Sequence, residues 1–142
     1  MIIADTNIVS EFMKDAPDPD VLAWAQTLDP TDLTISVVTV EEIDRGLGRL
    51  AMGRRRKDLE RRWVRLLDTF ADTIATYDLA AAHATAQVLS DGMDHGRPIS
   101  LADAQIAGIC LAQGAALATR NVKDFAQLAD LNLINPFDNP PA

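Results

Sequence analysis

Acidic residues stand at four places where a fold could bring them together. Asp5 directly follows a short apolar run, and the pair Glu41 and Glu42 comes just after a second, β-branched run. Asp103 lies near the start of a helical segment, and Asp124 follows a later apolar run by a few residues. Carboxylates held within a few ångströms repel one another, and a divalent cation removes that conflict. The pattern predicts a metal site.

The donor chemistry of such a site favours a hard cation. All of the candidate side chains offer oxygen, and the sequence has neither a second cysteine nor closely spaced histidines. Oxygen ligands of this kind suit Mg²⁺ or Mn²⁺ rather than Zn²⁺. Such ions activate water and stabilise charge in phosphodiester cleavage. A purely structural interpretation stays open, because Asp5 or Thr6 could only cap a helix and Ser100 with Asp103 could form a capping box.

Strand-like and helix-like segments alternate along the chain. Apolar or β-branched runs predict five strands at about 1–4, 33–38, 73–77, 115–119 and 131–134. Between them, helical spacing predicts helices at about 8–13, 21–28, 40–50, 54–70, 79–89 and 101–113, with a short helix after residue 121. Residues 90–98 are expected to form a loop, and a polar, proline-ended tail closes the chain.

This alternation predicts an α/β sandwich with a mainly parallel sheet. Thr39 is expected to cap the helix that begins at about residue 40, with Glu42 completing a capping box. In an open parallel sheet, ligands bind at the carboxyl edge of the strands. Asp5 and the later acids all fall at or near that edge, so the fold would place them side by side.

Length and composition indicate an ordinary globular domain. The chain has 142 residues, of which 48 % are hydrophobic, and its apolar runs are too short for a membrane span or a signal sequence. We therefore expect a soluble, cytoplasmic protein that does not associate with membranes. The single cysteine, Cys110, lies in an apolar segment and is expected to be a buried small side chain in a reducing compartment.

Charge is distributed unevenly along the chain. The net charge is −8, which argues weakly against a general polyanion binder, yet nine of the 13 basic residues lie in 45–65 beside only two acids. This basic segment could bind nucleic acid, pair with an acidic protein partner or form a solvated helix surface. Its candidate contacts to RNA or a partner include Arg45, Arg49, Arg54, Arg55 and Arg56.

Five motifs in order resemble those of PIN-domain ribonucleases, of the kind found as VapC-type toxins in type II toxin–antitoxin pairs, and most closely the FitB-like branch. Any one of these motifs alone would be weak, but together they span nearly the whole chain. The matching segments are 4–11 (ADTNIVSE), 42–46 (EIDRG), 96–99 (GRPI) with 103–107 (DAQIA), 118–125 (ATRNVKDF) and 135–137 (NPF).

The resemblance implies one PIN domain over residues 1–142, with a helical arm at about 40–70. Its fold would be a three-layer α/β/α arrangement with a mainly parallel, five-stranded sheet. Asp5, Glu42 and Asp103 would be the metal-binding and catalytic acids, and Asp124 a further one. Glu42 is favoured over Glu41 because the family acid is followed by an apolar residue and, four positions on, by glycine.

The fourth motif departs from the family pattern. Asn121 stands where some members have an acid, so Asp124 is the nearby carboxylate and a second metal would be weakly held. Thr6, Thr119 and Asn121 would support the acids or a metal-bound water, and Asn7 is a lesser candidate.

The implied function is that of a Mg²⁺- or Mn²⁺-dependent endoribonuclease toxin that cleaves RNA and slows translation and growth. Its partners would be a VapB-type antitoxin, an RNA substrate and a second copy of the chain within a larger toxin–antitoxin assembly, with operator DNA bound only through the antitoxin.

Two rival functions stay open. One is a catalytically weak PIN-like binding module that acts through its partner and DNA autoregulation, which Asn121 and the acidic net charge favour. The other is a phosphotransfer domain with Asp5 as nucleophile. The sequence lacks the usual Asp-x-Asp of that chemistry, because position 7 is asparagine.

Overall fold

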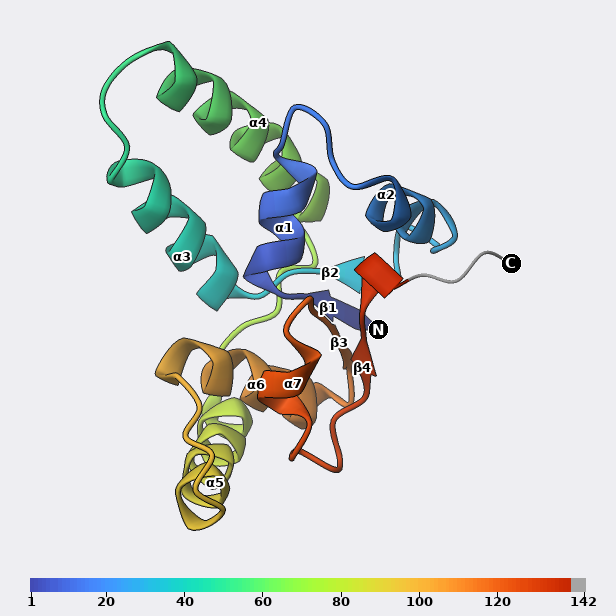
Figure 1. The fold of residues 1–142 in the computed structure, drawn as a ribbon, viewed down its shortest axis with the longest axis vertical. Helices are drawn as coiled ribbons and strands as arrows, with labels where there is room; N and C mark the ends of the chain where they lie inside the picture. The colour runs from blue at the N-terminus through green and yellow to red at the C-terminus, as the bar shows by residue number, and fades with distance from the viewer. Residues whose placement is uncertain (139–142) are drawn as a thin grey trace.

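A computed structural model describes residues 1–138 as an α/β fold around a small parallel sheet (Figure 1). All of the sheet's pairings are parallel, in the order β2-β1-β3-β4. Its strands are β1 (Ile2–Ala4), β2 (Leu33–Thr34), β3 (Ala116–Ala118) and β4 (Leu133–Ile134). The expected polar tail, and the last four residues of the expected single domain, lie outside the described residues.

Helices cover both faces of this sheet, as Figure 1 shows. They are α1 (Thr6–Phe12), α2 (Pro19–Gln26), α3 (Val37–Gly48), α4 (Arg54–Phe70), α5 (Leu79–Asp94), α6 (Leu101–Gln113) and α7 (Val122–Phe125), followed by the 3₁₀ turn η1 (Pro136–Asp138). The side chains of Ile3 and Leu117 pack with the core formed by α5, α6 and α7, whereas Ala4 and Ala118 pack with the core formed by α1 to α4. Successive strand residues point to opposite faces, so the two cores confirm the three-layer α/β/α prediction.

The expected strand at 73–77 is reduced to a single bridge, so the described sheet has four strands rather than five. Ser36 pairs with Ala75 in an isolated parallel bridge. The Ala75 N–H donates to the Ile35 carbonyl and the Val37 N–H donates to the Ala75 carbonyl, both at 2.9 Å. Residue 37 already begins a helix, and the pairing ends there because a helix offers no further strand partner.

Two helix ends differ from the sequence prediction by more than two residues, the start of α3 and the end of α5. Ser36, and not Thr39, caps α3: its backbone is extended and its hydroxyl accepts from the Thr39 N–H at 3.3 Å. Helix α5 continues to Asp94, past the expected end at residue 89. It ends where Gly96 adopts φ 64°, a left-handed conformation that glycine tolerates.

Helices α3 and α4 form the basic arm, which spans residues 37–70 and corresponds to the helical arm expected at 40–70 (Figure 1). Side-chain hydrogen bonds hold α4 in place. The indole Nε1 of Trp63 donates to Asp44 Oδ1 of α3 at 2.8 Å, and Arg62 Nη1 donates to the Met13 carbonyl at the end of α1 at 2.8 Å. Over the described residues, none of the helices has the length and apolar character needed to cross a membrane.

Candidate active site at the carboxyl edge of the sheet

Asp5 lies where β1 ends and α1 begins, and the residue is only 3 % exposed. One carboxylate oxygen accepts from the Thr6 N–H at 2.8 Å, so Asp5 does cap α1. The other accepts from the Thr119 hydroxyl at 2.8 Å and from the Asn7 side-chain amide at 3.2 Å. Asp5 therefore joins the ends of β1 and β3, in addition to capping the helix.

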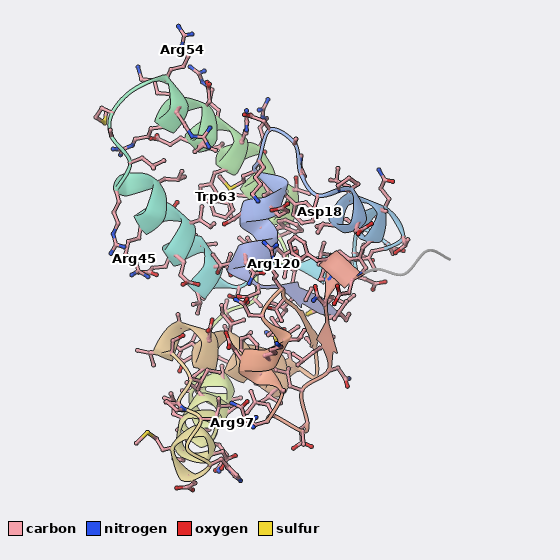
Figure 2. All side chains as sticks on the ribbon, viewed as in Figure 1. Asp18, Arg45, Arg54, Trp63, Arg97 and Arg120 are labelled. Atoms are coloured by element: carbon pink, nitrogen blue, oxygen red, sulfur yellow. The ribbon has the colours of Figure 1, made fainter. Side chains whose placement is uncertain are left out.

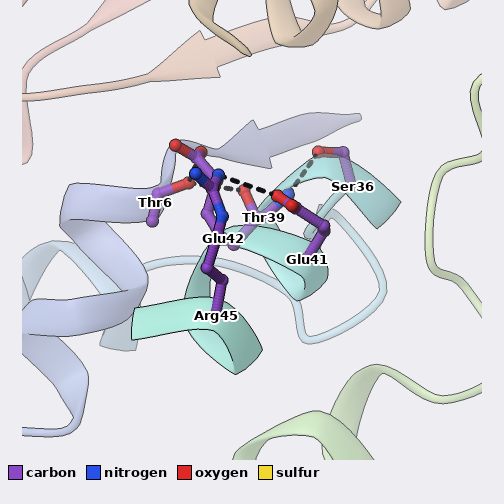
Figure 3. A network of polar contacts seen from close by, with 6 residues as sticks. All are labelled: Thr6, Ser36, Thr39, Glu41, Glu42 and Arg45. Atoms are coloured by element: carbon purple, nitrogen blue, oxygen red, sulfur yellow. Dashed lines mark hydrogen bonds and ion pairs between the residues drawn. The ribbon is translucent and has the colours of Figure 1, made fainter. Parts of the chain in front are cut away.

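Glu42 reaches the same edge from the second turn of α3 (Figure 3). Its Oε1 accepts from the Thr6 hydroxyl at 2.6 Å, and that hydroxyl also lies 3.0 Å from Thr39 Oγ1. Glu41 instead forms an ion pair with Arg45 at 3.0 Å on the exposed side of the helix. The geometry thus distinguishes two neighbouring acids that the residues alone left ambiguous.

Asp103 and Asp124 approach from the other side of the edge. Asp103 is half-buried in the first turn of α6, where its N–H donates to the Ser100 hydroxyl at 3.2 Å, and Asp124 is exposed on α7. Both line one cavity of about 450 Å³. We call Asp5, Glu42, Asp103 and Asp124 the site acids.

The charges of the site acids influence one another. Burial raises the pKa of Asp5 to about 6, the hydrogen bonds from Thr119 and Thr6 oppose this rise, and the charges of Asp103 and Glu42 add to it. Burial also raises the pKa of Asp103, a hydrogen bond with Ser100 opposes it, and Glu42 and Asp124 add to it. The charges of Asp103 and Glu42 therefore act on Asp5, and those of Glu42 and Asp124 act on Asp103.

Polar side chains around Asp5 fix its orientation. Thr119 is fully buried, and its hydroxyl also accepts from the Asn121 N–H at 3.1 Å. Asn7 Oδ1 accepts from the Arg120 N–H at 3.2 Å, so Asn7 contacts both Asp5 and the segment after β3. Asn121 itself is exposed at the start of α7.

The role of Thr39 escaped the sequence analysis, which assigned it to a helix cap. The residue is completely buried inside α3 and contacts Thr6 instead. Its position three residues before Glu42 was the available signal, because residues at i and i+3 share one helix face.

The arginines expected to contact RNA or a partner divide into two groups. Arg45 and Arg56 form ion pairs with Glu41 and Glu60 at 3.0 and 2.7 Å, whereas Arg49, Arg54 and Arg55 take part in none of the ion pairs within residues 1–138. Arg55 also lines a cavity of about 300 Å³ together with Thr6 and Glu42. Arg55 therefore shares a cavity with Glu42, one of the site acids.

The sequence profile of the PIN domain matches residues 2–131. The chain belongs to the PIN domain family. It is 34 % identical to VapC ribonuclease Y4jK of Sinorhizobium fredii over 97 % of this chain and 99 % of that protein. It is 33 % identical to toxin FitB of Neisseria gonorrhoeae over 96 % of this chain and 99 % of that protein. The resemblance inferred from the motifs is therefore confirmed.

Among solved structures, the fold of this PIN chain is similar to that in the structure of FitAB bound to an IR36 DNA fragment. The TM-score is 0.89 at 33 % identity, over 99 % of each chain. The similarity confirms that the parallel-sheet fold read from the sequence is a PIN-like fold.

The donor set of this PIN domain suits a hard divalent cation. None of the four site acids belongs to the ion pairs formed within residues 1–138, so no basic side chain there neutralises them at ion-pair distance. A cation would also relieve the repulsion that contributes to the raised pKa of Asp5. In the conformation described for these residues, no three His, Cys, Asp or Glu side chains are already arranged to hold one ion.

Proposed function

We propose that this PIN-domain protein is a metal-dependent endoribonuclease that acts as the toxin of a toxin–antitoxin pair. The observation that carries the proposal is that Thr6 contacts both Asp5 and Glu42 at the carboxyl edge of the sheet, while Asp103 and Asp124 line one cavity. None of these four acids has an ion-pairing base among the described residues. The names of the VapC ribonuclease and the FitB toxin, at 34 % and 33 % identity, support the same activity and biological role.

Asp5, Glu42 and Asp103 are the residues that would hold Mg²⁺ or Mn²⁺, with Asp124 contributing less directly. When bound, the cation supplies an activated water and stabilises the charge that develops on the phosphodiester. Asp5 can act as a ligand only when ionised, and the Thr119 hydroxyl and Thr6 N–H favour that form by donating to it. Side-chain rotation has to bring the carboxylates together for one ion to be shared.

The Thr6 hydroxyl orients Glu42 toward Asp5. It donates to Glu42 Oε1 at 2.6 Å, while the adjacent Thr6 N–H donates to Asp5. A single residue thus contacts two of the acids that approach from different elements. Such outer contacts fix the orientation of ligating side chains and commonly influence affinity by about 10- to 100-fold.

The proposal includes partners and an assembly. By analogy with FitAB, which was solved bound to DNA, the chain would bind a VapB-type antitoxin that blocks the site acids, and it would contact operator DNA only through that antitoxin. We propose in addition a homodimer within a larger complex, a cytoplasmic location, and one PIN domain over residues 1–142.

Neighbouring glutamates provide a matched test of this function. We expect Asp5→Asn, Asp103→Asn and Glu42→Gln each to reduce RNA cleavage by at least about 100-fold, because each removes a charged ligand. Glu41→Gln should retain activity within about twofold, since Glu41 faces Arg45 at the surface. The measurement is cleavage of a labelled RNA with Mg²⁺ or Mn²⁺, and EDTA should abolish it.

Two outcomes would contradict the proposal. Full activity of purified Asp5→Asn would overturn the assignment of the site acids. Absence of cleavage by folded wild-type protein with either metal, together with tight binding of an antitoxin, would support the rival binding module that Asn121 favours.

A further inference from the structure

A second feature of the active-site edge is the cavity that extends from Asp103 and Asp124 away from the basic arm. One wall is the loop between α5 and α6, which contributes Arg97 and Ser100, and the other is the segment of α7 with Lys123. The volume of this α6–α7 cavity is about 450 Å³. Figure 2 shows Arg97 far from Arg45 and Arg54 of the basic arm, so its charge acts at a different part of the surface.

Arg97 and Lys123 both bring positive charge to this cavity. Neither takes part in an ion pair within residues 1–138, although Asp103 and Asp124 line the same cavity. Both residues are exposed. Two basic side chains that are not paired with the neighbouring carboxylates are available to an anionic ligand.

The backbone that carries Arg97 is held in a defined position. The Arg97 N–H donates to the Gly92 carbonyl at 2.8 Å, and a Cβ placed on Gly92 would lie 2.8 Å from the Arg97 carbonyl oxygen. The chain reaches this contact through Gly96, whose φ of 64° permits the tight turn. The loop therefore packs closely on α5, and Arg97 starts from a fixed backbone rather than from a loose loop.

We propose that the α6–α7 cavity is a subsite for an RNA nucleotide next to the scissile bond, where Arg97 and Lys123 contact a non-scissile phosphate. This inference rests on the proposed ribonuclease function. A ligand that fills the cavity must lie against Asp103 and Asp124, as the substrate of these acids does. The neutral side chains of Ser100 and Gln127, also in the lining, can hydrogen-bond a ribose or a base. RNA offers this combination of anionic and polar groups.

The test removes one positive charge from the protein and, separately, one negative phosphate charge from the RNA. Arg97→Gln and Lys123→Gln are compared with Arg61→Gln, which removes an exposed charge on α4 that already pairs with Asp58 and lies away from the cavity lining. A set of single-stranded RNAs each carries one uncharged methylphosphonate at a non-scissile position. For wild-type protein, one position beside the cut should raise KM by about fivefold to tenfold, as expected for loss of a charged contact.

The decisive result is whether the protein substitution and the methylphosphonate have additive effects on KM. At that same position, methylphosphonate should have little further effect in Arg97→Gln or Lys123→Gln, whereas Arg61→Gln should behave as wild type. Equal effects of each methylphosphonate in wild type and in both cavity variants would overturn the subsite. The subsite would also be overturned if the two cavity variants bound RNA normally and lost affinity only for an antitoxin. That result would assign the two cations to a protein partner.

A measurement of RNA binding distinguishes failure of the subsite from failure of the proposed nuclease function. Anisotropy with the labelled RNA in EDTA, which prevents metal-dependent cleavage, should show weaker binding by Arg97→Gln and Lys123→Gln than by Arg61→Gln. If wild-type protein fails to cleave RNA but this pattern holds, the nuclease proposal fails and the subsite stands. If cleavage and binding are normal in both cavity variants, the subsite fails and the nuclease proposal stands.

Discussion

Asp5 is the most buried of the site acids, and its burial links function to stability. Because its pKa is raised from 3.8 to about 6, the folded chain binds the Asp5 proton more tightly than the unfolded chain does. The stability that this proton provides is fully present below about pH 3.8 and is lost as the pH rises through about 6. This difference between the folded and unfolded pKa of Asp5 corresponds to at most roughly 3 kcal/mol of unfolding free energy.

We therefore predict different pH profiles for metal-free wild-type protein and Asp5→Asn. Between pH 4 and pH 7.5, the unfolding free energy of wild type should fall relative to the variant by about 1–3 kcal/mol, because only wild type must ionise a buried carboxyl. Urea unfolding in EDTA measures this difference. Glu41→Gln controls for the loss of one negative charge, and parallel profiles for wild type and Asp5→Asn would contradict the prediction.

Thr119 gives a second prediction at the scale of one residue. Its hydroxyl donates to Asp5 at 2.8 Å and so favours the ionised carboxylate against the effect of burial. Thr119→Val should raise the pKa of Asp5 further and move the acidic limb of the pH–rate profile upward by about half a unit to one unit. Thr119→Ser, which keeps a hydroxyl, should restore the wild-type profile. An unshifted limb in Thr119→Val would show that the hydrogen bond has no such influence.

Sequence reasoning could propose the site acids but could not predict all of their contacts. Asp5 could be located because strand and acid are adjacent in the chain. The glycine of the family motif favours Glu42 over Glu41, but the contact that holds Glu42 depends on where Thr6 lies, 36 residues away. Helical spacing alone cannot supply that position. The buried contact of Thr39 with Thr6 depends on the same long-range packing.

At the scale of elements, Gly108 sets how closely α6 packs on α5. A Cβ on Gly108 would lie 2.1 Å from Thr85 Oγ1 and 2.8 Å from the Ala81 carbonyl oxygen, so a side chain has no room. We predict that Gly108→Ala destabilises the protein by about 2 kcal/mol or more and lowers activity, because α6 carries Asp103. Urea unfolding and RNA cleavage measure the two effects.

Gly46 provides the matched control for that substitution. It also lies within a helix, α3, but no atom lies within 4 Å of the position that its Cβ would occupy. Gly46→Ala should leave stability unchanged or raise it by up to about 1 kcal/mol, from helix propensity alone. Equal losses in both variants would show that the close packing of α5 and α6 does not limit stability.

Apolar and β-branched runs in the sequence predict some strands of the sheet but not others. The strands β1, β3 and β4 were predictable because short apolar runs sit between helical segments. Residues 73–77 have the β-branched composition of a strand but form only one bridge, since a helix begins at Val37 in the segment that would pair with them. Strand length depends on the partner, which composition does not reveal.

At the scale of the whole molecule, positive charge is concentrated on the basic arm and the rest of the chain is acidic. Nine of the 13 basic residues lie in 45–65, in a molecule of net charge −8. Hydrogen bonds from Trp63 and Arg62 hold α4 against α3 and α1, so the arm keeps its charges in a fixed relation to the site acids. Arg55 reaches from the arm into the cavity that Glu42 lines.

This arrangement predicts that RNA contacts the arm through those arginines that the chain itself does not pair. Combining Arg49→Gln, Arg54→Gln and Arg55→Gln should reduce the slope of log KM against log salt concentration by about 0.7 per lost phosphate contact on single-stranded RNA.

The control triple combines Arg45→Gln, Arg56→Gln and Arg61→Gln, whose guanidinium groups pair with Glu41, Glu60 and Asp58. Because both triples remove the same net charge, only contacts with RNA distinguish them. We expect a smaller change of slope in the control, since its arginines already have partners. Equal changes would show that the arm acts through net charge alone, and an unchanged slope with weaker antitoxin binding would assign the arm to the protein partner.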